Sequence, residues 1–334
     1  PVSEMPYTYA SKNTMAAPYE EYLTLVPGGE VTLEMFLFGC QPEWNNYACA
    51  KVLDRVLDVY APDKRPDLSL QRVWDLGIAF SQALTKDCFG KKMQFTHYTY
   101  RLYKAQHDMS VTPEEMKYMM EEPYYTELGR FGKAFVIGWT GQGAMEARMF
   151  IIDGLAKENN DELQLGISQL DNWVATQQEN GLLRPHYQNN FPDDDSPKVH
   201  PDACNMGWAM AEVAKSYRLL KEHGIDKPEY LRFSVKMCEF ALKHFSPEYG
   251  FGKSWDMDGS VINKTGSIGG YIIMGLVEAY REVQDARYLD LAAKAMDFYY
   301  NRDLNHFECT AGALDCCCVD KETAYPFLHS AVVL

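Results

Sequence analysis

The feature of this sequence that most constrains its fold is a series of helical segments that alternate in character. Segments 203–214 and 268–277 are apolar nearly all round, which is typical of helices enclosed by other helices. Segments 161–178 and 286–301 carry one apolar stripe opposite a charged face, which is typical of helices at an outer surface. The pattern therefore predicts inner and outer helices in antiparallel pairs.

Helical periodicity extends over most of the chain that follows residue 42. Tyr230-Leu231 of one outer segment recurs as Tyr288-Leu289 in the next, which indicates that one helical hairpin is the repeating unit. The expected helices span 43–60, 69–86, 140–157, 161–178, 203–222, 229–245, 267–284, 286–301 and 320–334.

The first forty residues have a different pattern. Residues 22–26 and 31–38 are strand-like, and Pro27-Gly28-Gly29-Glu30 between them has the composition of a hairpin turn. A single hairpin cannot bury its own apolar face in water. We therefore expect residues 1–40 to be the end of an N-terminal β domain with a linker, and residues 41–334 to be the helical domain.

Composition limits the partners of the chain. Its 32 Lys and Arg residues face 47 Asp and Glu residues, and no basic stripe could neutralise a phosphate backbone, which argues against nucleic acid. The longest strongly apolar stretch, 271–277, is far shorter than the ~20 residues that cross a bilayer, so we expect no membrane span. Nine cysteines, with Cys316, Cys317 and Cys318 adjacent, suit paired disulfides poorly. This favours a reducing compartment, and we expect a cytoplasmic protein.

The lengths of the connections indicate where a functional site lies. Connections from inner to outer helices are tight, whereas those from outer to inner helices, 87–139, 179–202, 246–266 and 302–319, are long. Long loops in a compact domain are usually functional. All of them fall on the rim that holds the N-termini of the inner helices, whose free N–H groups suit oxygen-rich ligands. We expect the active site on this rim.

Alternating inner and outer hairpins, elaborated loops on one rim and a preceding β hairpin resemble the α/α toroid of six-hairpin glycosidases. The resemblance covers residues 43–334 and is architectural. It implies a mainly α, (α/α)6-toroid-like fold, incomplete at the C-terminus because the sequence ends inside an apolar helix, and preceded by a β-sandwich-like domain.

The same resemblance implies a carbohydrate substrate and glycoside hydrolase activity on an oligo- or polysaccharide. Two alternatives remain open: a polysaccharide lyase or sugar epimerase on a similar toroid, and a glycan-binding toroid without catalysis. Hydrolysis needs a carboxylic acid that protonates the leaving oxygen and a second carboxylate that acts as nucleophile or base.

The loop 249–259 is the densest source of such groups. Trp255 offers a flat apolar face for a sugar ring, and Asp256 and Asp258 follow it as catalytic candidates. An ordinary acidic turn is the alternative interpretation of the two acids.

The loop 179–202 supplies a second set. Asp202 precedes an inner helix, where it is either a catalytic acid or an N-cap. Arg184, His186 and Tyr187 are candidate sugar contacts. In the lyase or epimerase alternative, His186 and Tyr187 would abstract the proton and outrank the acids.

Two more inner helices contribute candidates. Trp139 and Gln142 lie at the head of one, as substrate-binding residues, with Glu146 a turn inside as a catalytic acid. The alternative is that Glu146 pairs with Arg148 or with a neighbouring helix, because a buried carboxylate there needs either a partner or a raised pKa. Lys321 and Glu322 lie near the mouth of the last helix, as a substrate-binding and a catalytic candidate.

Metal ligands are a lesser possibility. Asp193–Asp195 could bind Ca²⁺, and Glu308 with Cys309, Cys316 and Cys318 could bind Zn²⁺, although the cysteine spacing matches no zinc finger or ribbon. Free cysteines are commonly small core residues. We therefore expect no metal and no cofactor.

Overall fold

The computed structural model is mainly helical, with three two-stranded antiparallel sheets among the residues that it describes. These residues are 68–88, 90–94, 134–138, 143–188, 200–306, 310 and 324–334, with short pieces at 28–30, 51, 54–56 and 58–59. No helix among them is long and apolar enough to cross a membrane.

The helices begin and end close to the positions that periodicity predicts. They are α3 (Leu70–Leu84), α7 (Ala144–Ala156), α8 (Asn160–Val174), α9 (Ala203–Glu222), α10 (Pro228–His244), α11 (Tyr271–Val283), α12 (Ala286–Arg302) and α13 (Ala324–Val333). Two 3-10 turns, η3 (Ile268–Gly270) and η4 (Leu304–His306), precede α11 and follow α12. The paired strands are β1 (Thr85–Cys88) with β2 (Lys91–Gln94), β3 (Ala134–Val136) with β4 (His186–Gln188), and β5 (Ser254–Trp255) with β6 (Val261–Asn263).

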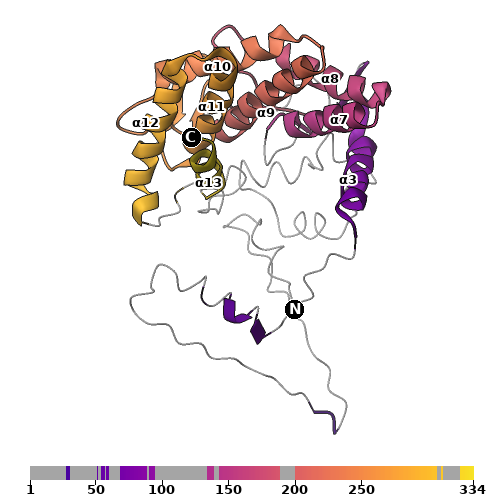
Figure 1. Cartoon of the computed structure of the whole chain (residues 1–334). Helices are drawn as coiled ribbons and strands as arrows, with labels where there is room; N and C mark the ends of the chain where they lie inside the picture. The colour runs from indigo at the N-terminus through magenta and orange to yellow at the C-terminus, as the bar shows by residue number, and fades with distance from the viewer. Residues whose placement is uncertain are drawn as a thin grey trace. The chain divides into compact units, whose positions relative to one another are not determined.

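The helices form two series, as the alternation of apolar and amphipathic segments predicts. α9 packs between α7 and α11, and α11 also contacts α13 (Figure 1). α8, α10 and α12 each pack against the inner helix that precedes them in the chain. In the described part of the chain, inner helices and outer helices thus alternate as hairpins in a toroid-like arrangement.

The repeated tyrosine joins neighbouring outer helices. The Tyr230 hydroxyl at the start of α10 donates to a carboxylate oxygen of Asp171 on α8 at 2.8 Å. One hairpin later, the Tyr288 hydroxyl at the start of α12 donates to Glu239 on α10, also at 2.8 Å. Lys227 also donates to the Asp171 carboxylate in the first of these two contacts. The residues that repeat in the sequence therefore form the hydrogen bond by which each outer helix contacts the next.

The inner helices α9 and α11 approach closely where glycine replaces a side chain. A Cβ at Gly207 would clash with the backbone carbonyl of Tyr271, and one at Gly275 would clash with the Cβ of Met210. Both glycines are buried inside helices, where glycine costs about 0.5–1 kcal/mol relative to alanine. Close packing of the two inner helices is what offsets that cost.

The chain divides into two compact units, and the larger one includes Gly77–Leu334 and all of the helical hairpins from α7 onward. The predicted β hairpin and the boundary at residues 40 and 41 lie outside the described residues, apart from the turn residues 28–30. They therefore stay predictions.

We predict that Gly207→Ala lowers the free energy of unfolding by about 1–3 kcal/mol, because the added methyl group must push α9 away from α11. Gly77→Ala on α3 is the matched control, since its added Cβ has no atom within 4 Å from any described residue outside its own stretch of helix. That control should be neutral or stabilising by about 0.5–1 kcal/mol. Urea denaturation measures both, and equal effects would contradict the proposed close approach.

Candidate functional site

Long connections meet at the N-terminal ends of the inner helices. β3 and β4 pair, which joins the segment before α7 to the loop after α8. The Trp255 amide donates to the carbonyl of Pro201 at 2.9 Å, and the Ala203 amide donates to the carbonyl of Lys253 at 2.9 Å. Backbone hydrogen bonds therefore tie three of the outer-to-inner loops together around the starts of α7 and α9.

Three aromatic rings from consecutive inner helices meet at this end. The Trp208 ring of α9 lies 6.1 Å from that of Tyr271 on α11 and stacks on that of Tyr325 of α13, with ring centroids 5.0 Å apart. Tyr325 also lies 6.2 Å from Tyr271. Trp208 is 7% exposed and Tyr325 is 44% exposed, so the cluster has one buried and one open side.

Two buried nitrogens of this region lack a hydrogen-bond partner among the described residues. They are the indole Nε1 of Trp208 and the imidazole Nε2 of His329. The His329 ring lies 6.1 Å from that of Tyr325. Buried polar groups are nearly always paired in native proteins, so these two nitrogens are polar atoms that a ligand could satisfy.

Glu146 lies in the first turn of α7. Its half-buried carboxyl group has a pKa raised to about 7, chiefly by burial, against the weaker opposing effects of the Gln94 side chain and the Gly143 amide. Gln94 is itself buried, so its side-chain amide faces the Glu146 carboxyl group away from solvent. A carboxyl group with this pKa exchanges protons near neutral pH.

Asp202 is the N-cap of α9, the structural role that the sequence left open. Its carboxylate accepts hydrogen bonds from the backbone and the side-chain amide of Asn205, at 2.8 and 2.7 Å. Burial nevertheless dominates and raises the pKa of Asp202 to about 6. The Asn205 side-chain oxygen also accepts from the Gly138 amide at 3.2 Å, which links this cap to the segment that leads into α7.

A layer of buried ion pairs lies deeper between the inner helices. Glu212 of α9 is 2% exposed and accepts hydrogen bonds from Arg148 of α7, at 2.5 Å, and from Lys215. Glu278 of α11 is equally buried and pairs with Arg218 of α9 and with Arg281. Each carboxylate therefore has two cationic partners, as a buried charge requires.

The charges of this layer affect the pKa of His329. Burial and the charge of Lys215 lower the pKa of His329, against the weaker effects of Glu278 and Glu212. The imidazole is therefore neutral near pH 7, and it lies between the aromatic cluster and the ion pairs. We name Glu146, Asp202, Trp208, Tyr271, Tyr325 and His329 the inner-helix mouth.

The loop that the sequence favoured is arranged differently from expectation. Trp255 is 1% exposed and packs edge-on against Phe240 at 5.3 Å, so its ring face is covered by the protein and offers no platform for a sugar. Asp256 and Asp258 are exposed. The backbone and hydroxyl of Ser260 donate to Asp258 at 2.8 and 2.6 Å, which lowers the pKa of Asp258. The acidic-turn interpretation describes this geometry.

The predicted contacts of the next loop are also largely structural. Tyr187 is buried in the core with its ring 5.8 Å from that of Trp173, so it offers no open face for a sugar. The Arg184 guanidinium lies over the Tyr187 ring, 5.7 Å from its centroid. His186 is in β4, opposite Val136.

The remaining predicted site residues lie outside the described ranges and stay predictions; they are Trp139, Gln142, Lys321 and Glu322. The possible metal ligands Asp193–Asp195, Glu308, Cys309, Cys316 and Cys318 lie outside them as well. Within the part of the chain that the structure describes, no group of His, Cys, Asp and Glu residues is arranged to hold a metal ion.

The aromatic cluster and His329 are the site residues that sequence reasoning missed. Trp208 and Tyr271 were assigned only to the apolar face of inner helices. Their position in the first two turns of those helices, at the rim where the long loops meet, is the signal that could have identified them.

No known family model matches the sequence, and no curated protein matches it either. Among solved structures, a D-mannose isomerase is similar over 57% of this chain and 56% of its own, with 13% identity and a TM-score of 0.42. A GH76 alpha-mannanase of Bacteroides thetaiotaomicron is similar over 79% of this chain and 78% of its own, with 12% identity and a TM-score of 0.43. The chain thus spans a little over half the length of the isomerase.

Proposed function

We propose that this protein is an enzyme that acts on carbohydrate at the inner-helix mouth, and that the reaction is hydrolysis of a glycosidic bond. The observation that carries the proposal is a pair of carboxyl groups, Glu146 and Asp202, in neighbouring inner helices with pKa values raised to about 7 and about 6. Titratable groups shifted toward neutral pH by burial cluster at catalytic sites.

The chemistry of the mouth suits a sugar. A pyranose ring has an apolar C–H face that packs on an aromatic ring, and hydroxyl groups at its edge that need donors and acceptors. Tyr325, which is 44% exposed and stacks on the buried Trp208, offers the aromatic surface. The unpaired Trp208 Nε1 and His329 Nε2 offer the polar contacts.

We assign the two acids to different roles because Asp202 accepts two hydrogen bonds from Asn205 that stabilise its ionised form, whereas burial dominates at Glu146. Between pH 6 and pH 7, Glu146 is mostly protonated and can give its proton to the leaving glycosidic oxygen. Asp202 is mostly ionised in the same range and can act as the nucleophile or as the base toward water. One acid and one carboxylate are what glycoside hydrolysis requires.

A second candidate function is isomerisation or epimerisation of a free sugar. It is favoured by His329, a neutral imidazole beside the aromatic cluster that can accept a proton from a carbon next to a carbonyl group. In this candidate function His329 is the proton-abstracting residue, the role for which the sequence suggested His186 and Tyr187. Mannosides and free D-mannose, the sugars for which the two similar proteins are named, belong in the first substrate panel.

We predict that Glu146→Gln and Asp202→Asn each lower kcat for glycoside cleavage by about 10²–10⁴-fold, because each removes one proton-transfer group. Asp285→Asn is the matched control, since Asp285 caps the outer helix α12 in the way that Asp202 caps α9. Asparagine caps a helix about as well as aspartate, so all three proteins should stay folded.

Reducing-sugar release from a panel of glycosides measures the rates, and ketose formation from D-mannose is followed in parallel. Full activity of Glu146→Gln would reject the proposed acid. Sugar interconversion that depends on His329 but not on Glu146 would reject hydrolysis in favour of the second candidate.

We also predict a bell-shaped dependence of kcat/KM on pH. Activity should fall below about pH 6, where Asp202 takes up a proton, and above about pH 7, where Glu146 loses one. In Glu146→Gln, the pH profile of the residual activity should lose its fall above pH 7 and keep its fall below pH 6. If the fall above pH 7 were unchanged in that variant, a group other than Glu146 would cause it.

A further inference from the structure

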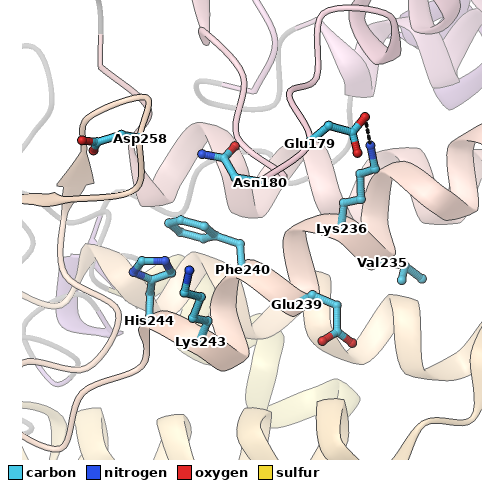
Figure 2. A pocket seen from close by; sticks show the side chains of 9 residues that line it. All are labelled: Glu179, Asn180, Val235, Lys236, Glu239, Phe240, Lys243, His244 and Asp258. Carbon is cyan, nitrogen blue, oxygen red and sulfur yellow. Dashed lines mark ion pairs between the residues drawn. The ribbon is translucent and has the colours of Figure 1, made fainter.

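A pocket of about 340 Å³ lies outside the inner-helix mouth, between the loop that follows α8, the C-terminal half of α10 and the turn that joins β5 to β6 (Figure 2). Its volume is within the range of small-molecule sites. None of the mouth residues lines it. The lining residues are Glu179, Asn180, Val235, Lys236, Glu239, Phe240, Lys243, His244 and Asp258.

Two stacked rings form the apolar part of this pocket. The imidazole of His244 lies 4.2 Å from the ring of Phe240 with an angle of 22° between the planes. Trp255 supports Phe240 from the side that faces the core. Gly259, whose φ of 93° favours glycine, packs against the edges of both rings, where a side chain would be too close.

The charges of the pocket are nearly balanced. Lys236 pairs with Glu179 at 3.1 Å, and Glu239 pairs with Arg287 at 2.8 Å. Burial lowers the pKa of His244, which is therefore neutral near pH 7. The charges that are left, Lys243 and Asp258, have opposite signs. A pocket without a dominant charge selects against strongly charged ligands and suits a neutral one.

The polar groups at the pocket's edge are both donors and acceptors. The Asn180 amide donates to the carbonyl of Met257 at 2.7 Å, which fixes its orientation beside the pocket. Ser260 holds the exposed Asp258 carboxylate in place, and Lys243 makes no ion pair with any described residue. A ligand with several hydroxyl groups can bond to an ammonium, a carboxylate and an amide at once.

We propose that this pocket is a second saccharide-binding site, which takes a sugar unit of a neutral oligosaccharide by stacking on the half-buried His244, whose ring is supported by Phe240, and by hydrogen bonds to Lys243, Asp258 and Asn180. Its ligand class rests on the proposed function. The turn that carries Asp258 leads directly from Ser254, which bridges to Asp202, so the pocket and the mouth belong to the same rim. A non-reacting part of a long substrate is the occupant that this placement favours.

The test uses the full chain with Glu146→Gln, so that bound sugar is not consumed, and compares Lys243→Ala and His244→Ala with the control Lys264→Ala. Lys264 is an exposed lysine on the same rim that does not line the pocket. Calorimetry with neutral mannan and glucan oligosaccharides gives the affinities.

Each pocket variant should bind the neutral oligosaccharides about 3- to 10-fold more weakly, with the control unchanged. Both variants, without Glu146→Gln, should cleave a small chromogenic glycoside as wild type does. Unchanged oligosaccharide affinity in both pocket variants would overturn the second site alone. If polygalacturonate fragments bound as tightly as the neutral oligosaccharides, the proposal of a neutral ligand class would be overturned. Absence of saccharide binding and cleavage in every variant and in wild type would instead overturn the proposed function.

Discussion

The close approach of α9 and α11 is the constraint on which the rest of the described structure depends. Gly207 and Gly275 leave out the side chains that would hold the two helices apart. Because they do, Trp208 of α9 comes within reach of Tyr271 on α11 and of Tyr325 on α13. Helix packing in the core thus decides which rings meet at the inner-helix mouth.

Buried charge is the second constraint. Glu212 and Glu278 sit in the middle of inner helices that are otherwise apolar, and each accepts two cationic partners, some from a neighbouring inner helix. A buried ion pair seldom stabilises a protein more than packed apolar side chains would, whereas loss of one partner is strongly destabilising. The layer therefore fixes how the inner helices are aligned, and it sets the electrostatic environment of His329.

Sequence periodicity predicted the helices and their division into inner and outer series well, because both depend on local spacing of apolar residues. It also placed Glu146 and Asp202 at the rim, because helix starts can be recognised from caps and glycines. Their raised pKa values follow from burial, which only the packed structure supplies.

The exposure of single aromatic rings was not predictable in this way. Trp255 was expected to face a sugar, but Phe240 from the preceding helix covers it. Tyr187 is covered in the same way by Trp173. Conversely, Trp208 and Tyr325 are near neighbours only in space, so no sequence window contains both. Whether an aromatic residue serves the core or a site depends on such distant partners.

The most direct test of the central claim is a crystal structure of the Glu146→Gln protein with the sugar that the substrate panel selects. We expect density for a sugar ring against Tyr325, with a ring hydroxyl or oxygen within hydrogen-bond distance of Trp208 Nε1. A fully occupied sugar elsewhere on the protein, with the aromatic cluster closed by the protein's own side chains, would contradict the claim.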